Sequence, residues 1–439
     1  MKIQTSRRQF LKQTTWVAAG LGLAQTAGRV QAASSKRRPK TFAANDKLNI
    51  GVIGTANRAA ANINGVAGQN IVAICDVDEN YLNAAAARFP AAKRFTDFRR
   101  LLDQSKIDAV VISTPDHTHA VATVAALKAG KHVYCEKPLA HTVSEARIVA
   151  ETARGKALAT QMGNQIHAST NYRRVVELVQ TGAIGEVREV HVWVGTVWTP
   201  KPRPIEIIPV PPHLNYEMWL GPARYRPYHP NYLPRVWRGW WAFGGGTLAD
   251  FGCHYMDLPH WALDLGHPQT VEAEGPDPDP EGPPPWQIVR YEHPARDTRA
   301  AVTLTWYQGG KRPPHFAEGL LPKWGNGVLF VGAKGMLLAD YGKHVLLPED
   351  AYAGFQPPQP FIPDSLGHYE EWIQACKLGG KTTSNFEYAG RLTEVVHLGN
   401  VSHRVGNKKL TWDPVKLQAA NCPEAEEFIQ HDYRRGWHL

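Results

Sequence analysis

Lysine, aspartate and histidine side chains that could act on an alcohol carbon occur at two places in the chain. Lys137 stands between Glu136 and Pro138 at the end of an apolar run, and Asp250 and His254 follow three consecutive glycines. An ammonium group can stabilise negative charge that develops on an oxygen. An imidazole titrates near neutral pH and can accept or return the proton of a hydroxyl. These residue types predict acid–base chemistry at a carbon–oxygen bond.

The local setting of these residues leaves alternatives open. A Lys-Pro bond at the carboxyl end of a strand can be held cis, which would direct Lys137 into the crevice where open α/β sheets bind ligands. An exposed lysine at an ordinary strand end is the alternative. A helix from Thr247 would place Asp250 and His254 on one face, four residues apart. Asp257 and His260 extend the same predicted helix, so a metal site or a capped helix competes with catalysis.

The loop Gly54–Ala59 (GTANRA) lies between a predicted strand and a predicted helix, where Rossmann domains carry G-x-G-x-x-G. Ala56 at the second glycine position hinders close approach of the main chain to a pyrophosphate, whereas alanine at the third position is an accepted variant. Asp76 ends the next predicted strand, where a carboxylate binds both ribose hydroxyls and repels a 2′-phosphate. We therefore predict NAD, with NADP disfavoured. A Rossmann-like domain that has lost its cofactor is the alternative.

The run Thr114–His119 (TPDHTH) follows a third predicted strand. Asp116 could simply cap the next helix. The H-x-H pair could suggest a metal, but no third ligand lies nearby, so we expect none. The functional interpretation is contact with the nicotinamide end of the cofactor or with the substrate. The candidate cofactor-binding residues are therefore Gly54, Thr55, Ala56, Asn57, Arg58, Asp76, Thr114, Pro115, His117, His119, Glu136 and Lys137.

Alternating apolar strands and helices must position these segments. The predicted strands are 48–54, 71–75, 109–113, 132–135 and 158–162, and helices at 56–67 and 142–154 are among those between them. This alternation predicts an α/β fold with a doubly wound parallel sheet, a Rossmann domain over residues 47–165.

The pattern changes after about residue 185. Half-exposed strands are expected at 187–197, 288–291, 301–307, 327–331 and 335–340, with helices at 368–377 and 389–405. They predict an α+β domain over residues 166–439, with a large, open, mostly antiparallel sheet and C-terminal helices that return to the domain junction. Ten of the 14 tryptophans lie between residues 190 and 330. Most should fill the core, but aromatic faces also stack on sugars, which favours a carbohydrate-like ligand.

Composition excludes several classes of protein. The hydrophobic content of 43% and charged content of 20% are globular values. The net charge is +9, but five basic residues and no acid lie within residues 1–32, which leaves about +4 and does not favour a nucleic-acid partner. The five cysteines are odd in number and widely spaced, so no disulfide framework is expected.

The first residues predict export. Residues 6–12 (SRRQFLK) have the twin-arginine form, and a mildly apolar run at 16–27 leads to small residues around Ala32. That run is too short to span a membrane, so no stable membrane insertion is expected after the signal is removed. We expect a signal peptide at 1–33, a linker at 34–46 and a periplasmic location. The twin-arginine route is associated with proteins carried folded, often with a cofactor bound.

In order along the chain, these motifs resemble the glucose–fructose oxidoreductase / inositol dehydrogenase / rhizopine-catabolism (Gfo/Idh/MocA) family. The resemblance covers nearly the whole mature chain and rests on Gly54, Asp76, Thr114–His119, Glu136–Pro138, Asn215–Ala223, Trp237, Arg238, Gly244–Asp257 and Ser384–Leu398.

The resemblance implies a tightly held NAD(P), sugar or cyclitol substrates, and an open sheet that often forms homo-oligomers. It implies that Lys137, Asp250 and His254 meet at the reacting carbon. His254 would be the general base and acid, Lys137 would hydrogen-bond the reacting oxygen, and Asp250 would orient the imidazole or the substrate. The substrate-binding candidates are Glu136, Trp237, Arg238, Asp250 and His254.

The sequence therefore predicts an exported NAD(P)-dependent oxidoreductase that acts on the CH–OH group of a sugar or cyclitol. Free NAD is not expected outside the cytoplasm, so a bound cofactor must be recycled in place. Ping-pong oxidoreduction between two substrates, or transient oxidation within one cycle, would achieve this. One alternative is a glycosidase or epimerase-like enzyme that uses transient NAD oxidation. A second is a non-catalytic exported sugar-binding protein of the same fold.

Overall fold

The computed structural model describes Ala43 and residues 46–439. The predicted signal peptide at 1–33 lies outside the described residues, as does the predicted linker at 34–46 apart from Ala43 and Asp46. The described part of the chain belongs to one compact unit. Within it, no helix is both long enough and apolar enough to cross a membrane.

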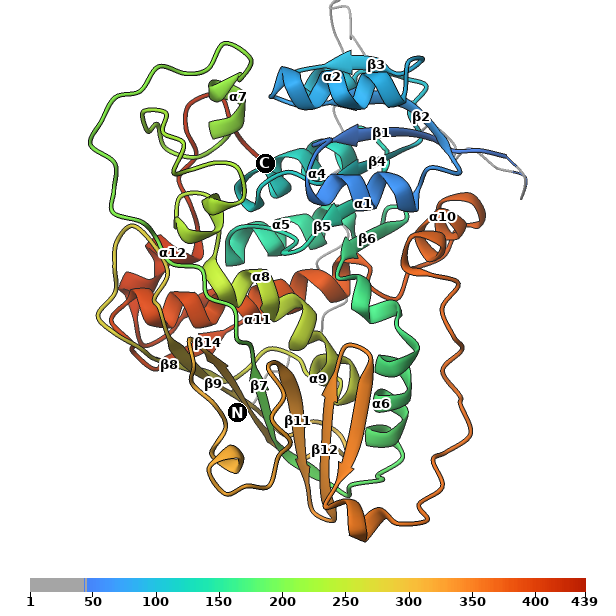
Figure 1. Ribbon diagram of the computed structural model, residues 1–439, viewed down its shortest axis with the longest axis vertical. Helices are drawn as coiled ribbons and strands as arrows, with labels where there is room; N and C mark the ends of the chain where they lie inside the picture. Colours follow the sequence, from blue (N-terminus) through green and yellow to red (C-terminus); the bar gives the residue numbers. More distant parts are fainter. Residues whose placement is uncertain (1–42, 44–45) are drawn as a thin grey trace, which may run out of the picture. The chain divides into compact units, whose positions relative to one another are not determined.

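A six-stranded parallel sheet occupies the first part of this unit, with strand order β3-β2-β1-β4-β5-β6 (Figure 1). The order runs outward in both directions from β1 and β4, which creates the switch point where open α/β sheets bind ligands. The doubly wound parallel sheet predicted from the sequence is confirmed. Its strands are β1 (Asn49–Ile53), β2 (Asn70–Cys75), β3 (Lys93–Phe95), β4 (Ala109–Ile112), β5 (His132–Glu136) and β6 (Thr160–Gly163).

Local sequence explains most elements of this sheet. β4 is a wholly buried apolar run, as central parallel strands require. α5 begins with a capping box, in which Thr142 and Glu145 satisfy each other's main-chain N–H groups. β3 was not predicted because it is a three-residue edge strand with two exposed basic residues. The helices are α1 (Arg58–Gly65), α2 (Glu79–Arg88), α3 (Phe98–Leu102), α4 (His119–Lys128) and α5 (Val143–Ala153).

A nine-stranded sheet forms the other half, in the order β13-β12-β11-β7-β10-β9-β8-β14-β15. Every pair is antiparallel except β7 with β10, so the predicted mostly antiparallel sheet is confirmed. β8, β13, β14 and β15 were not predicted, because they are short or carry charged residues. The strands are β7 (Val187–Trp193), β8 (Thr270–Glu274), β9 (Gln287–His293), β10 (Val302–Gln308), β11 (Gly327–Gly332), β12 (Gly335–Asp340), β13 (Lys343–Leu347), β14 (Leu410–Asp413) and β15 (Gln418–Ala419).

α8 and α11 lie between the two sheets (Figure 1). α11 is buried along most of its 19 residues and packs against both α5 and α8. Gly390 permits the contact with α5, because a Cβ there would lie 2.8 Å from that of Ala150. The helices of this half are α6 (Thr170–Gln180), α7 (Tyr216–Leu220), α8 (Gly246–Tyr255), α9 (Asp257–Ala262), α10 (His368–Leu378), α11 (Phe386–Arg404) and α12 (Glu426–Ile429).

The helix predicted to run from Thr247 through His260 is two helices. α8 ends at Tyr255 and α9 begins at Asp257, with Met256 between them. The expectation that Asp257 and His260 extend the helix of Asp250 and His254 is therefore wrong. The break separates the four residues into two pairs with different surroundings.

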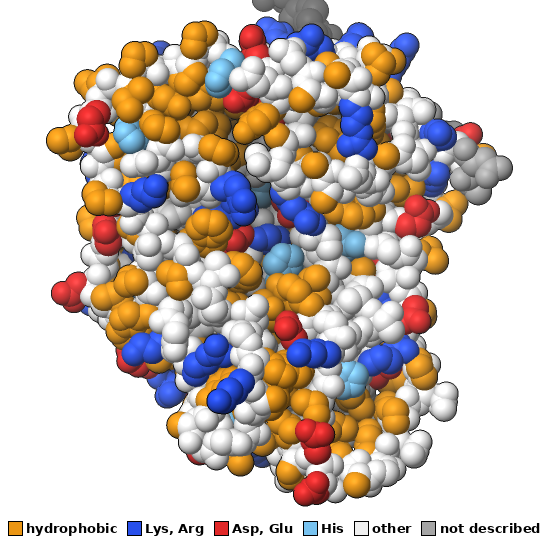
Figure 2. All heavy atoms as spheres, in the orientation of Figure 1, with side chains coloured by type: hydrophobic (Ala, Val, Ile, Leu, Met, Phe, Trp, Pro, Cys, Tyr) orange, Lys and Arg blue, Asp and Glu red, His pale blue; other side chains and the backbone are white. Residues whose placement is uncertain are grey.

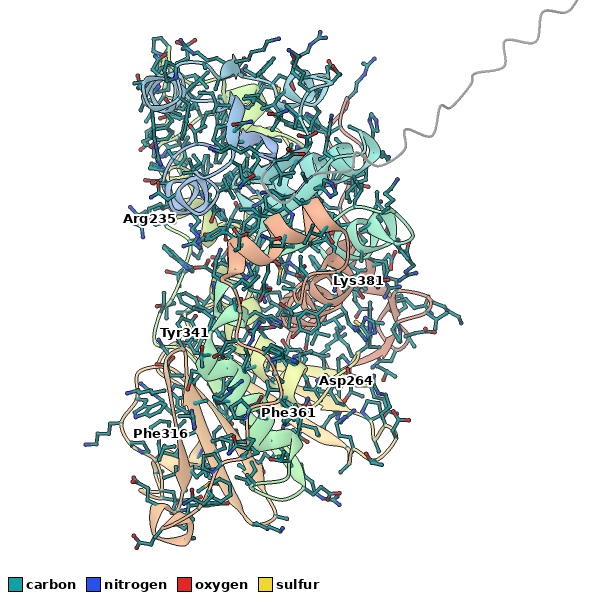
Figure 3. All side chains as sticks on the ribbon, turned by 90° about the vertical axis from the view of Figure 1, so that its right-hand side faces the viewer. Arg235, Asp264, Phe316, Tyr341, Phe361 and Lys381 are labelled. Carbon is teal, nitrogen blue, oxygen red and sulfur yellow. The ribbon has the colours of Figure 1, made fainter. Side chains whose placement is uncertain are left out.

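The chain itself covers part of the outer face of the nine-stranded sheet. Phe316 packs edge-on against Trp193, with ring centroids 5.2 Å apart, and lies beside the strands in Figure 3. Leu321, Leu329 and Leu338 are buried in the same cluster. An oligomer formed through this sheet, as expected from the sequence, would have to use the part that the 309–326 segment leaves free.

A buried ion pair ties α5 to α11. Arg147 Nε and Nη2 each donate to one oxygen of the Glu394 carboxylate, both at 2.8 Å. The Glu394 side chain is 3% exposed. His267 also contacts this carboxylate at 2.8 Å. Two parallel hydrogen bonds to one carboxylate fix the relative orientation of the two side chains and bring their opposite charges together.

Substituting Arg147 by Met should lower the apparent free energy of unfolding by about 3 kcal/mol, because it leaves a buried carboxylate without its main counter-charge. Urea unfolding measures this. Arg154→Met is the matched control: Arg154 is exposed and lies 3.8 Å from Glu387, so its loss should cost under about 0.5 kcal/mol. Equal effects of the two substitutions would contradict the assignment.

Candidate functional site

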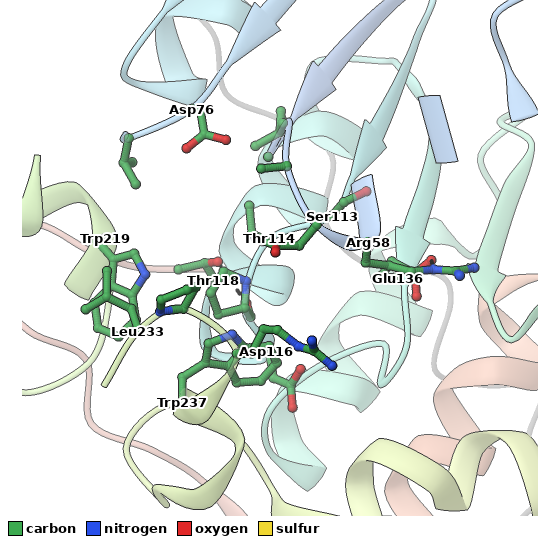
Figure 4. A pocket seen from close by; sticks show the side chains of 18 of the residues that line it. Arg58, Asp76, Ser113, Thr114, Asp116, Thr118, Glu136, Trp219, Leu233 and Trp237 are labelled. Carbon is green, nitrogen blue, oxygen red and sulfur yellow. Dashed lines mark hydrogen bonds and ion pairs between the residues drawn. The ribbon is translucent and has the colours of Figure 1, made fainter. Parts of the chain in front are cut away.

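A cavity of about 810 Å³ opens at the carboxyl ends of β1, β2, β4 and β5 and extends to α8. Its walls therefore come from both halves of the chain. On the face in Figure 2, a hollow gathers basic, acidic and histidine side chains. Figure 4 shows Asp76, Thr114, Asp116, Glu136 and Trp237 around the cavity.

The turn between β1 and α1 explains the missing glycines of the nucleotide loop. Gly54 has φ +82°, and a Cβ there would lie 2.8 Å from the carbonyl oxygen of Ser113. Asn57 is the other residue of the turn with a positive φ, 55°, and its ψ is −114°. Ala56 has no such constraint, and Ala59 is buried in the core behind the turn. The turn thus needs glycine only at its first position.

Asp76 stands at the cavity wall directly after β2. Its carboxylate accepts hydrogen bonds from the main-chain N–H of Thr55 at 2.8 Å, the Thr55 hydroxyl at 2.9 Å and the Asp78 N–H at 3.0 Å. Burial raises the pKa of Asp76, although these bonds oppose the shift. The cradle at Gly54, the α1 N-terminus and Asp76 fit a dinucleotide: they would hold its pyrophosphate and its adenosine ribose.

The Thr114–His119 run divides between cavity and core. Thr114 and Pro115 line the cavity. His117 and His119 do not line it, so the cavity gives no support to their predicted contact with cofactor or substrate. Both ring nitrogens of His117 lie within 3.3 Å of the carbonyl oxygens of Trp219 and Phe243. Those of His119 lie within 2.8 Å of the carbonyl oxygens of Pro138 and Thr114. Both imidazoles therefore brace neighbouring loops.

Lys137 and Asp250 meet in the cavity. The Lys137–Pro138 peptide bond is cis, which is one of the two arrangements that the sequence left open, and Lys137 lines the cavity. Its Nζ donates to the Asp250 main-chain carbonyl at 2.5 Å and also pairs with the Asp250 carboxylate. Arg238 Nε donates to the same carboxylate at 3.0 Å, and Trp198 Nε1 at 2.8 Å. Burial raises the pKa of Asp250, but these cations and hydrogen bonds outweigh it and hold that pKa well below its usual value.

His254 lies in the cavity wall but is not hydrogen-bonded to Asp250. The Asp250 carboxylate bonds to Lys137, Arg238 and Trp198, so of the two expected roles of Asp250, orienting the imidazole or orienting the substrate, the first has no hydrogen bond behind it among the described residues. His254 Nδ1 is buried and has no partner among the described residues. Tyr341, labelled in Figure 3, packs edge-on against the ring at 5.9 Å. Burial, with help from the Lys137 charge, holds the pKa of His254 well below its usual value, so the ring is neutral at neutral pH.

Asp116 is the main cavity residue that sequence reasoning missed. It caps no helix: α4 begins at His119, and Asp116 lies in a short 3₁₀ turn before it. Its side chain is buried at 3% exposure and lines the cavity. Burial raises the pKa of Asp116 to about 7, with Asp250 adding to the effect and Arg238, Lys137 and the Gly245 N–H opposing it. The available signal was an aspartate soon after a predicted strand, next to Thr114 and Pro115.

The remaining candidates also have defined places. Glu136 accepts from Arg58 at 3.0 Å and from Gln165 at 2.8 Å, so it positions the cavity wall beside Lys137. Trp237 and Arg238 stack at 4.2 Å and both line the cavity. The cavity is also lined by residues that were not named as candidates from the sequence, namely Trp198, Trp219, Leu233, Arg235 and Phe251.

Asp257 and His260 belong to the core instead. Asp257 pairs with His167 at 2.9 Å and accepts from the Tyr388 hydroxyl at 2.6 Å. His260 Nδ1 lies 2.8 Å from the Met256 carbonyl oxygen. Across the described residues, no group of three or more His, Cys, Asp or Glu side chains is arranged to hold a metal ion.

A parallel sheet with a dinucleotide turn, joined to an open sheet across a charged cavity, defines an NAD-binding class of oxidoreductase fold. Comparison with known proteins agrees. Residues 48–164 match the Gfo/Idh/MocA model described as "Oxidoreductase family, NAD-binding Rossmann fold", and residues 169–302 match its companion, "Oxidoreductase family, C-terminal alpha/beta domain". The chain belongs to the Gfo/Idh/MocA family of oxidoreductases.

Three known proteins are similar to parts or to the fold of this chain. Inositol 2-dehydrogenase 2 of Saccharopolyspora erythraea is 36% identical over 150 residues, which is 33% of this chain and 44% of that protein. A glycosyl hydrolase family 109 protein of Solibacter usitatus is 33% identical over 199 residues, 42% of this chain and 44% of that protein. The chain thus matches less than half the length of these relatives. The WlbA dehydrogenase of Bordetella pertussis, solved with NADH and UDP-GlcNAcA, shares the fold at a TM-score of 0.60 and 18% sequence identity. The superposition covers 84% of this chain and 99% of that chain.

Asp116→Asn should change how stability depends on pH. The folded pKa of Asp116, about 7, lies above the usual aspartate value of about 3.9, so the folded state holds a proton that the unfolded state releases. The wild type should therefore lose about 1.4 kcal/mol of stability per pH unit between pH 4 and 7 through this group. The variant should lack this loss. Urea unfolding of both proteins at pH 5 and pH 7 gives the difference, and parallel pH dependences would refute the burial of a titrating carboxyl here.

Proposed function

We propose that this protein is an NAD-dependent oxidoreductase that acts on a hydroxyl or ketone of a sugar or cyclitol. The observation that carries the proposal is the contact of Lys137 with Asp250 inside a cavity that also holds the dinucleotide turn. Aromatic walls from Trp198, Trp219 and Trp237 favour a sugar, since the faces of sugar rings stack on aromatic rings. Inositol 2-dehydrogenase among the relatives supports the same substrate class.

The residues have separate tasks. When bound, NAD supplies the acceptor for the hydride of the alcohol carbon. Lys137, held beside Asp250, donates a hydrogen bond to the reacting oxygen, which stabilises the negative charge that develops there. Arg238 and Trp198 fix the Asp250 carboxylate, so Asp250 positions Lys137. The stacked Trp237–Arg238 pair shapes the substrate side of the cavity.

Two groups can take the hydroxyl proton. His254 lines the cavity and its ring is neutral, as the sequence-based assignment requires. Asp116 is a second candidate, because a general base works best when its pKa lies near the working pH. The two assignments differ in pH dependence, since the low pKa of His254 would place its titration well below neutrality.

The cofactor is proposed to be NAD. The Asp76 carboxylate, held by Thr55 at the end of β2, would bind ribose hydroxyls and repel the 2′-phosphate of NADP. Export by the twin-arginine route to the periplasm is part of the proposal and rests on the motif at residues 6–12. A cofactor carried out with the folded protein would then be recycled by a second substrate or within one cycle.

Lys137→Met should lower the rate of bound-cofactor reduction by sugars about 100-fold to 1000-fold, because a preorganised donor to the developing charge is lost. Stopped-flow absorbance of reduced nicotinamide measures the rate, and the nucleotide released on denaturation measures cofactor content, which should not change. Lys128→Met, an exposed substitution on α4, is the control. A variant that retains its rate within about threefold would remove Lys137 from the chemistry.

Asp116→Asn and His254→Asn should separate the proton acceptors. If Asp116 accepts the proton, the wild-type rate falls below about pH 7. Asp116→Asn then loses this limb of the profile and His254→Asn keeps it. The reverse pattern assigns the task to His254. The measurement is kcat/KM against pH for all three proteins.

One relative favours a second candidate function, a glycosidase that works by transient oxidation of the sugar by NAD. The family 109 glycosyl hydrolase matches a longer stretch of the chain than the inositol dehydrogenase does. The same lysine and proton acceptor would serve that oxidation. Release of aglycone from a glycoside with no net formation of NADH would establish the glycosidase. Net transfer of reducing equivalents from a free sugar would establish the oxidoreductase.

A further inference from the structure

We propose that a second cavity, on the far side of Gly245 from the proposed active site, binds a small organic polyanion through Arg404. The cavity has a volume of about 840 Å³ and is built from the end of α11, the segment around Trp241, and α12. It shares no lining residue with the cavity that holds Lys137. The proposal is independent of the oxidoreductase function.

Arg404 is the reason to expect an anion. Its guanidinium lies 5.0 Å from the ring of Trp241 and 4.2 Å from the ring of Phe428. Among the described residues, it has no hydrogen-bond acceptor and no carboxylate within ion-pair distance. The two aromatic contacts cover the cation but leave its N–H groups unused. Burial lowers the pKa of Arg404 to about 10, opposed only by Glu427, which shows that its counter-charge is incomplete.

Other polar residues line the same space. His397 and Asn400 are buried at 4% and 5% exposure and line the inner end of the cavity with His141. His397 Nε2 and Asn400 Nδ2 already bond to the carbonyl oxygens of Ala140 and Gly245, at 2.8 Å each. Arg226 also lines the cavity, and among the described residues its Nη1 is engaged by Glu281 at 2.5 Å. A guanidinium with free N–H groups matches the oxygens of carboxylate or phosphate groups.

Acidic residues also line the cavity, but they are exposed and most are engaged. Glu424 pairs with Lys408, Glu426 accepts from Gln430, and Asp432 pairs with Arg224. Glu427 is exposed and is the one acid that acts on Arg404, from beyond ion-pair distance. The competing explanation is that Glu427 alone serves as the distant counter-charge of Arg404.

The size of the cavity sets the class of ligand. A single phosphate ion would leave most of about 840 Å³ empty, whereas a di- or tricarboxylate or a phosphorylated metabolite would span from Arg404 to Arg226. Carboxylate and phosphoryl groups share the chemistry that a guanidinium recognises, so citrate and inorganic phosphate are the two probes.

Isothermal titration of the full chain with citrate, inorganic phosphate and glucose tests the proposal. At least one of the two anions should bind, and glucose should not bind at this site. Binding of citrate alone assigns a carboxylate ligand, and binding of phosphate assigns a phosphorylated one. Arg404→Gln should weaken the anion at least tenfold, and Arg404→Lys should weaken it less. Arg312→Gln, which removes an arginine stacked on Phe316 elsewhere, should have no effect.

Glu427→Gln separates the two explanations even if the Arg404 variants fail to fold. It removes an exposed negative charge beside the cavity, so anion binding should become two- to fivefold tighter. If Arg404 instead depends on Glu427, this variant lowers the unfolding temperature and gains no anion affinity. That outcome, binding that survives Arg404→Gln, or failure of both anions to bind the parent protein, would overturn the proposal.

Discussion

The contact between the Lys137 ammonium and Asp250 is the interaction on which the site depends. It joins a strand end of the parallel sheet to a helix of the other half, across 113 residues of sequence. Both side chains are nearly buried, at 12% and 11% exposure, so neither charge is solvated well without the other. Arg238 and Trp198 bond to the same carboxylate, and no hydrogen bond joins it to His254 among the described residues.

This arrangement sets different protonation states for neighbouring groups. Asp250 stays ionised because two cations and an indole N–H surround it, whereas Asp116, buried in the same cavity, titrates near pH 7. His254 remains neutral because it is buried beside the Lys137 charge. Groups whose pKa values are driven apart in this way can divide the work of holding charge and moving protons.

Gly245 links the two cavities. Its N–H faces Asp116 on one side, and its carbonyl oxygen accepts from Asn400 at 2.8 Å on the other. The glycine-rich segment before α8 is therefore a thin wall between two charged spaces. A wall of this kind can be built only where side chains are absent: a Cβ on Gly245 would lie 2.5 Å from that of Ala249.

The sequence by itself determined the type of both sheets, most of their central strands and the nucleotide turn. These features follow from local patterns: buried apolar runs, and glycine where φ is positive. The meeting of Lys137 with Asp250 was implied by the family resemblance. Tertiary structure decided what each side chain faces. It buried His117 and His119 in the core and paired Asp250 with Lys137, with no bond to His254 among the described residues. It also buried Asp116, which raises the pKa of that carboxyl to about 7. The decisive partners of His117 and Asp250 come from segments more than a hundred residues away, and no local pattern encodes them.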